Sequence, residues 1–342
     1  MKSHNAYEKM PKSLKKLNLN DAQTAALDKL KWVVTEKIHG ANFGFVYEQK
    51  RLKFAKRKEF LDWSDDFFGF QWAASRLESQ LLALFERLSL DIPAEKYTIY
   101  GELFGGAYPH PDVTPTEGAQ AIQTGIYYSP NIEFCGFDIA VEPADAPKYY
   151  IDYEQASAYF EQFGILYAKS LFTGSLNQAL GFNIRFNSHI PNLLGLPDLG
   201  DNLVEGVVIK PLNNPAPELF EIRPIFKLKN REFEEDERFH EAEKWGFIPK
   251  VVAQSEEMGF WVEELNAYLN PARVESAISK IGRLDPQNAA RMQALETEIW
   301  KDILEDFEQN TPDLLALLDD SQQQWLKDRT LANIRSFMRE KF

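Results

Sequence analysis

The chain has 342 residues, and 44% of them, including 25 Phe, are hydrophobic, so it can build two domains with sizeable cores. It has no run of about 18 apolar residues, which argues against a transmembrane helix. Its first residues lack a hydrophobic signal core, so we expect a cytoplasmic protein. The single cysteine, Cys135, excludes an internal disulfide framework and a cysteine-built zinc site. Its apolar neighbours favour a buried, inert thiol.

The net charge of −14 argues against a generally basic surface for nucleic acid. Residues 231–342 carry 14 basic and 24 acidic side chains, whereas the first 230 residues carry 24 and 28. RNA binding nevertheless needs only a local basic patch. Basic residues do cluster at 12–16 and 50–58. A solvated face is the simplest interpretation of both clusters, and we prefer it for the first.

The first 230 residues contain many short apolar and β-branched runs that predict strands, with few helices between them. Two of these runs flank a short polar segment and predict a hairpin. Few segments alternate as strand, helix and strand, so we expect mostly antiparallel sheets. The predicted strands are residues 32–38, 43–47, 52–55, 97–104, 132–141, 203–209 and 225–228, and the predicted helices are 68–88 and 151–163.

The sequence changes character near residue 230 and becomes charged, with helical periodicity up to the last residue. Asn270-Pro271 and Thr311-Pro312 mark breaks between helices. The predicted helices are residues 231–245, 251–269, 274–281, 286–307 and 313–342. We therefore predict an α+β protein with an antiparallel-sheet domain at 1–230 and a small all-α domain at 231–342.

A lysine, Lys37, stands at the end of an apolar run within Thr35-Glu36-Lys37-Ile38-His39-Gly40-Ala41-Asn42. Lysine followed by histidine and glycine is a weak signal alone. Five further fragments follow it in order, and the ordered series is a strong signal. They are Lys56-Arg57, Tyr100-Gly101-Glu102-Leu103-Phe104-Gly105, Phe137-Asp138-Ile139, Glu205-Gly206-Val207-Val208-Ile209-Lys210 and Phe226-Lys227-Leu228-Lys229.

These residue types suit the transfer of a nucleotide to a lysine. An ordinary lysine titrates near ~10.4, so its amine must lose a proton before it attacks a phosphate. Neighbouring cations and partial burial ease that loss. Lys227 and Lys229 alternate along one strand and so share a face. That face can meet Lys37 and hold a phosphate, although such a pair is commonly a solvated edge.

Carboxylates and one aromatic residue supply the remaining parts of such a site. Glu205, Asp138 and Glu102 sit beside apolar strand residues, where oxygen ligands for Mg²⁺ could be held. A lone carboxylate at a strand end is otherwise usually a cap or an ion-pair partner. Phe137 could stack on a purine, although core packing is the default role of a strand phenylalanine. Gly40 would let the backbone approach the nucleotide closely.

The ordered series resembles the motifs of the covalent nucleotidyltransferases, which are the polynucleotide ligases and capping enzymes. Within them it resembles the RNA ligase 2 family of double-stranded RNA ligases. His39 distinguishes the RNA ligase 2 family from DNA ligases and capping enzymes, which commonly have Asp at that place. Asn42 also stands where this family has Asn. The resemblance implies an ATP-grasp-like nucleotidyltransferase fold for residues 30–230. The helical tail has the position and size of that family's C-terminal domain.

The resemblance also implies a role for each site residue. At the nucleotide, Lys37 would be adenylated and Phe137 would stack on adenine. The other nucleotide-binding residues would be Glu36, Ile38, Asn42, Arg57, Glu102, Val207, Lys227 and Lys229. Glu205, with Asp138, would bind the divalent metal, Mg²⁺ or Mn²⁺. His39, Asn42 and Arg57 would contact the RNA substrate. Lys37, Glu205, Lys227 and Lys229 would carry the catalysis.

The resulting prediction is an ATP-dependent RNA ligase that seals 3′-OH and 5′-phosphate ends through a lysyl-AMP and an RNA-adenylate. We expect a monomer that acts on nicked duplex RNA and has no contact with a membrane. Two alternatives remain open at this point. One is a DNA ligase or a GTP-dependent capping guanylyltransferase of the same superfamily. The other is a non-catalytic RNA-binding scaffold, against which the retained Lys37 argues.

Overall fold

The computed structural model describes residues 6–11, 17, 19–216, 219–220, 223–235, 259–285, 288–310, 315, 318 and 320–341. The chain forms two compact units, Met1–Val251 and Val252–Phe342. We expected the division at residue 230. Phe233 of α6 (Glu232–Glu235) is instead buried beside Ile38 and Val204, so the residues directly after 230 belong to the first unit. The basic cluster at 12–16 lies outside the described residues.

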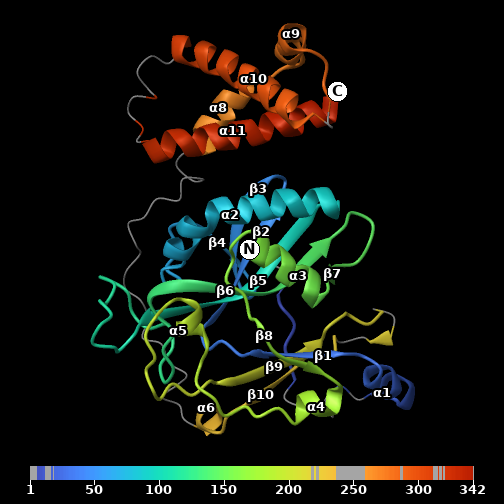
Figure 1. Cartoon of the computed structure of the whole chain (residues 1–342), viewed down its shortest axis with the longest axis vertical. Coiled ribbons are helices and arrows are strands. Elements are labelled where there is room, and N and C mark those ends of the chain that lie inside the picture. Colours follow the sequence, from blue (N-terminus) through green and yellow to red (C-terminus); the bar gives the residue numbers. More distant parts are fainter. Residues whose placement is uncertain are drawn as a thin grey trace. The chain divides into compact units, whose positions relative to one another are not determined.

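The first unit contains two antiparallel sheets, which confirms the predicted sheet type (Figure 1). The larger sheet has six strands in the order β4-β3-β2-β5-β6-β7. Their bounds are β2 Ala41–Glu48, β3 Arg51–Lys56, β4 Phe60–Leu61, β5 Lys96–Ala107, β6 Ser129–Glu142 and β7 Tyr149–Tyr150. The predicted hairpin is β2 and β3, which turn through Gln49 and Lys50, both with positive φ. Such a turn matches the twist of the two strands.

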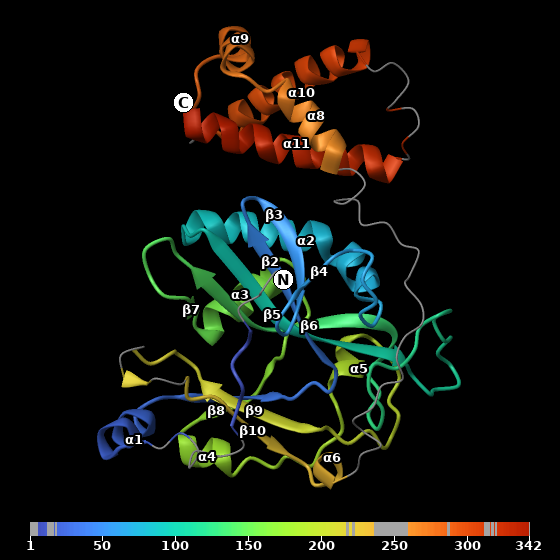
Figure 2. The same cartoon turned by 180° about the vertical axis from the view of Figure 1, so that it is seen from behind.

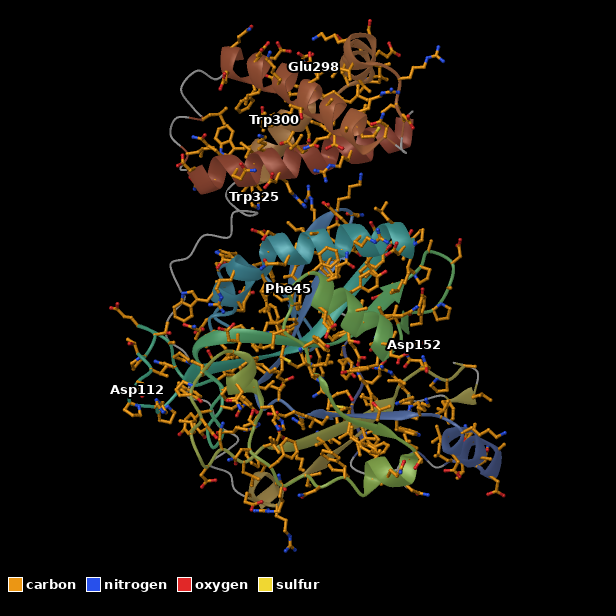
Figure 3. The ribbon with its side chains drawn as sticks, viewed as in Figure 1. Phe45, Asp112, Asp152, Glu298, Trp300 and Trp325 are labelled. Carbon is orange, nitrogen blue, oxygen red and sulfur yellow. The ribbon has the colours of Figure 1, made fainter. Side chains whose placement is uncertain are left out.

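One face of this sheet packs against helices. Phe43, Phe45 and Tyr47 alternate along β2 and pack with Phe70 and Phe85 of α2 (Phe70–Asp91). Figure 3 labels Phe45 in the layer between this helix and the sheet. α3 (Tyr153–Gln162) covers the neighbouring strands β5 and β6 (Figure 1). The apolar period of residues 68–88 thus predicted α2 correctly.

The smaller sheet has four strands in the order β10-β9-β1-β8. Their bounds are β1 Trp32–Glu36, β8 Ser170–Gly174, β9 Gly206–Pro211 and β10 Phe226–Lys229. Trp32, Val34 and Val207 form a core with α1 (Asp21–Asp28) and α4 (Leu176–Leu180) on one face. The opposite face turns toward the larger sheet (Figures 1 and 2). A short helix, α5 (Ile190–Leu193), lies in the connection between β8 and β9.

The second unit is helical in its described residues, as predicted. Its helices are α8 Gly259–Ala267, α9 Pro271–Ile281, α10 Ala289–Asn310 and α11 Asp320–Lys341. Asn270 caps α9 by accepting a hydrogen bond from the Arg273 amide, and Pro271 takes the first helical position. Leu265, Val274, Ile299 and Ile334 are among its fully buried residues. Trp300 and Trp325 lie toward this core, whereas Glu298 lies at its surface (Figure 3).

Candidate active site

Lys37 follows β1 directly and faces the space between the two sheets. Its amide donates to the carbonyl of Gly206 at 3.0 Å, which continues the pairing of β1 with β9. Its Nζ lies 2.5 Å from Oε2 of Glu205. Nζ of Lys229 lies 2.5 Å from the other oxygen, Oε1. The structure therefore brings together three predicted residues from three distant parts of the chain.

Glu205 is the centre of this cluster, and its side chain is only 1% exposed. Burial by itself would favour the neutral acid. The charge of Lys37, together with His39 and Lys229, nevertheless holds the pKa of Glu205 well below its usual range. The group is therefore a carboxylate at neutral pH.

His39 reaches the same carboxylate, with its Nδ1 3.2 Å from Oε2 of Glu205. Its backbone amide donates to the hydroxyl of Tyr128 at 2.9 Å, and its ring meets Phe233 edge-on. Gly40 follows, where a Cβ would lie 2.0 Å from the carbonyl oxygen of Leu103. Glycine is thus required here because the chain passes close to β5.

Glu102 and Lys227 line the same site from the two sheets. Burial raises the pKa of Glu102 to about 7, which the charges of Lys37, Lys227 and Arg57 oppose. Lys227 lies two residues before Lys229 on β10 and shares its face, as predicted. Arg57 is exposed directly after β3. These charges act on one carboxyl group, so the predicted fragments converge in space.

Glu36 is buried directly before Lys37 in the chain. The Ser188 hydroxyl donates to its Oε1 at 2.5 Å, and the His189 amide donates to its Oε2 at 3.1 Å. Burial raises the pKa of Glu36 to about 7, although these two hydrogen bonds oppose the shift. Sequence reasoning missed Ser188 and His189. Their role depends on a contact across 152 positions, which no local pattern reveals.

A pocket opens beside Lys37 between the two sheets. Glu36, Ile38, Asn42, Glu102 and Phe137 line it, as do Val208 and Asp138. The ring of Phe137 is partly buried and meets the Tyr7 ring edge-on, with 4.9 Å between centroids. Val207, which we expected at the nucleotide, belongs instead to the core with Trp32. Side chains alternate along β9, so Val208 takes the place in the pocket wall.

Asp138 is buried in a charged network in the wall of this pocket. Lys210 donates to it at 2.8 Å, and Arg223 donates to both oxygens at 2.8 and 2.9 Å. The Tyr7 hydroxyl donates a further bond at 2.5 Å. Burial favours the neutral acid, but Arg223 and Lys210 hold the pKa of Asp138 well below its usual range. The sequence interpretation gave no role to Tyr7, Lys210 or Arg223.

The donor set limits the kind of metal site that fits. The described residues contain no group of three or more His, Cys, Asp or Glu side chains that could hold a metal ion. Mg²⁺ usually takes one or two carboxylates and completes its shell with water and substrate phosphates. Glu205 beside the pocket fits that mode. Both oxygens of Asp138 are bonded to Lys210 and Arg223, and both oxygens of Glu205 are bonded to Lys37 and Lys229, so the metal role of each stays a prediction.

Two further sequence expectations concern the chain as a whole. Cys135 is fully buried, and burial raises the pKa of its thiol well above the ordinary value. Within the residues that the structure describes, no helix combines the length and the apolar character that a membrane span needs.

Comparison with known proteins gives matches to both units. Residues 30–229 match the family described as RNA ligase, and residues 252–335 match the one described as T4 RNA ligase 2 C-terminal. RNA-editing ligase 2, mitochondrial, of Trypanosoma brucei brucei is 32% identical over 200 residues, covering 52% of this chain and 48% of that protein. RNA-editing ligase 1, mitochondrial, of the same organism is 29% identical over 332 residues, covering 81% of this chain and 70% of that protein. The chain thus spans about half the length of the first relative.

Solved structures of Naegleria gruberi RNA ligase are also similar. A mutant with ATP and Mn has a TM-score of 0.45 at 15% identity, covering 69% of this chain and 62% of that chain. The ligase with PPi has a TM-score of 0.44 at 16% identity, covering 69% of this chain and 59% of that chain.

Two antiparallel sheets that enclose a pocket with a lysine and a paired carboxylate define a nucleotidyltransferase domain. The RNA ligase match covers more than half of the chain. The chain belongs to the RNA ligase family. The match of residues 252–335 confirms the expected resemblance to RNA ligase 2.

Proposed function

We propose that this protein is an ATP-dependent RNA ligase that seals 3′-OH and 5′-phosphate ends, preferably at nicks in duplex RNA. The observation that carries the proposal is the pairing of Lys37 with Glu205 at 2.5 Å, beside a pocket lined by Phe137 and Glu36. In this pocket the ring of Phe137 can stack on a purine, and the buried carboxyl group of Glu36 can hydrogen-bond to the edge of the purine. The proposal includes a monomer that acts in the cytoplasm.

In the first proposed step, the deprotonated Lys37 amine attacks the α-phosphorus of ATP. A nitrogen–phosphorus bond forms, the bond to the bridging oxygen breaks, and pyrophosphate leaves. AMP then passes to the RNA 5′-phosphate, which frees Lys37. The RNA 3′-OH finally attacks that phosphate, forms the phosphodiester bond and releases AMP. Each displacement depends on positioning and on neutralised charge, so one set of residues can serve all three steps.

The contacts support specific roles in this scheme. Lys227 and Lys229 would hold the AMP phosphate, and Lys229 already lies against Glu205. Glu205 would hold Mg²⁺ or Mn²⁺, which supplies charge neutralisation to the phosphates. Arg57 would contact the RNA 5′-phosphate from the mouth of the site. His39 and Asn42 would contact substrate near Glu205 and Glu102.

Other residues would form the walls of the nucleotide site. Phe137 would stack on adenine, with Ile38 and Val208 packed around the base. Glu36 would read the base edge, and Glu102 would hold the ribose. Asp138 would keep Lys210 and Arg223 in place behind the base.

Intact mass spectrometry after incubation with Mg²⁺ and ATP tests the proposal directly. The protein, first cleared of bound AMP with pyrophosphate, should gain the mass of one AMP. Lys37→Ala should gain none, whereas Lys31→Ala, an exposed lysine six residues earlier, should behave as the wild type. An adduct with GTP alone would indicate a capping enzyme. The absence of any adduct would favour a non-catalytic scaffold.

A further inference from the structure

The carboxyl group of Glu36 is held at both of its oxygens by two consecutive residues. The Ser188 hydroxyl donates to Oε1 at 2.5 Å, and the His189 amide donates to Oε2 at 3.1 Å. Both donors lie directly before α5, in the connection between β8 and β9. Glu36 lines the pocket beside Lys37, whereas Ser188 and His189 are not among the described residues that line it. Their influence on the pocket therefore passes through Glu36.

The surroundings of Ser188 orient its hydroxyl as a donor to Glu36. Its oxygen accepts a hydrogen bond from the Ile190 amide at 3.2 Å, which leaves the hydroxyl proton to point toward Glu36. The Ser188 amide donates to the carbonyl of Asn202 at 2.9 Å. The Asn202 side chain in turn bonds both backbone groups of Tyr127. Ser188 and Glu36 are both buried, so the donor keeps its place instead of turning toward water.

These two hydrogen bonds matter because Glu36 has little support from a counter-charge. Among the residues that the structure describes, the basic group that pairs with it is the His189 ring, which is 55% exposed and 3.9 Å away. Tyr128 and Cys135 lie near enough for the charge of Glu36 to raise their pKa, and both stay neutral at neutral pH. Burial raises the pKa of Glu36 to about 7, and the bonds from Ser188 and His189 oppose that rise. Without the Ser188 hydroxyl, the acid form of Glu36 would persist to a higher pH.

The ionised and the acid form of a carboxyl group prefer different purines. Adenine presents an amino donor at C6, whereas guanine and hypoxanthine present a carbonyl acceptor at the same place. A carboxylate accepts from the amino group and repels the carbonyl, whereas a carboxylic acid can donate to the carbonyl. A group that keeps Glu36 an oriented acceptor therefore favours adenine.

We propose that Ser188 is a positioning residue for nucleotide selection, because its hydroxyl holds Glu36 as the acceptor for the amino group of adenine. This inference rests on the proposed function, in which Glu36 reads the edge of the base. His189 supplies the second donor through its backbone, which a change of its side chain does not remove. A buried polar group left unpaired by the wrong base is costly, so one fixed acceptor can discriminate strongly between the two purines.

Single-turnover reaction of Lys37 with ATP and with inosine triphosphate, which carries the C6 carbonyl, tests the role of Ser188. The assay is run at about pH 8, where Glu36 of the wild type is mostly ionised. The wild type should have the higher kcat/KM for ATP, and Ser188→Ala should lower the ratio of the two values about tenfold or more. Ser188→Thr keeps the hydroxyl and should keep the ratio. Ser79→Ala removes an exposed hydroxyl of α2 and is the matched control, with the wild-type ratio expected.

The outcomes separate this inference from the proposed function. An unchanged ratio in folded Ser188→Ala would overturn the inference, even if the reaction with both nucleotides were slower. If Ser188→Ala unfolds, Ser188→Cys, a weaker donor of similar size, should give a ratio between those of wild type and Glu36→Gln. In a Glu36→Gln background, Ser188→Ala should cause no further fall, and a further tenfold fall would show that Ser188 acts by another route. A wild type that gains no AMP from ATP would instead contradict the ligase proposal.

Discussion

The amine of Lys37 lies 2.5 Å from Oε2 of Glu205, so the proposed nucleophile is paired with the proposed metal carboxylate. Lys229 occupies the second oxygen of the same group. In the proposed reaction, ATP and a metal therefore enter a site where lysine and carboxylate charges are already paired. Glu205 positions Lys37 before the substrate arrives, and phosphates can then take over the two lysines.

Glu205→Gln should abolish adenylylation and also destabilise the first unit. The change leaves Lys37 and Lys229 at a half-buried site without their shared counter-charge, and breaking such a pair costs about 3 kcal/mol. Thermal unfolding should show a lower Tm than the wild type. Addition of Mg²⁺ and ATP should raise the Tm of the wild type and leave that of the variant unchanged. A variant that still gains AMP at the wild-type rate would contradict the role of Glu205.

Glu36 should make stability fall as the pH rises. Its pKa is about 7 in the folded protein and near 4.5 when it is not buried. The folded state therefore keeps a proton that the unfolded chain loses between these values. Its contribution is fully present below pH 4.5 and is lost as the pH rises through 7, which amounts to about 3 kcal/mol.

Urea unfolding at several pH values between 5 and 8 measures this effect. Glu36→Gln cannot titrate, so the wild type should lose stability relative to this variant across that range. Glu154→Gln, on an exposed position of α3, should keep the wild-type pH dependence. Parallel curves for wild type and Glu36→Gln would show that Glu36 is ionised throughout the range.

Asp138→Asn should be among the most destabilising single changes in the first unit. Asp138 is the carboxylate that compensates Lys210 and Arg223, and both cations are largely buried. Removal of its charge leaves them uncompensated, which costs about 3–5 kcal/mol. Asp145→Asn, on an exposed loop position, is the control and should unfold like the wild type. Asp138→Asn/Lys210→Met should recover part of the loss, and no recovery would contradict the charge argument.

The sequence predicted the parts of this protein that depend on local pattern. The apolar period of residues 68–88 located α2, and the alternation of Lys227 and Lys229 placed both on one face. The ordered fragments identified Lys37 and Glu205, which the structure brings together. The resemblance placed Val207 at the nucleotide, whereas Val208 lines the pocket, because the assignment depends on which face of β9 meets the pocket.

Other parts of the site depend on tertiary contacts and left no local signal. Ser188 orients Glu36 across 152 positions, and Tyr7 reaches Asp138 across 131. The boundary at residue 230 missed the first residues of α6 for the same reason, since Phe233 packs against His39, Ile38 and Val204 in a contact that the sequence does not reveal. A charged helical pattern after residue 230 could not show to which unit the first turn belongs.

Tyr128→Phe should slow adenylylation without removing any group that touches ATP. The Tyr128 hydroxyl accepts from the backbone amide of His39 at 2.9 Å, and both groups are buried. Loss of the hydroxyl leaves that amide unsatisfied, at a cost of about 1–3 kcal/mol. The chain between Lys37 and Gly40 would then shift, and His39 would lose its position beside Glu205.

Tyr127→Phe is the matched control, because the side chain of Tyr127 is only half-buried and its backbone amide donates to Asn202. Single-turnover adenylylation at saturating ATP should be slower for Tyr128→Phe and unchanged for Tyr127→Phe. The apparent affinity for ATP should change little, since the pocket walls remain. A lower Tm with an unchanged rate would show that Tyr128 supports the fold alone. A slower rate at a temperature where both variants are fully folded would establish Tyr128 as a positioning residue.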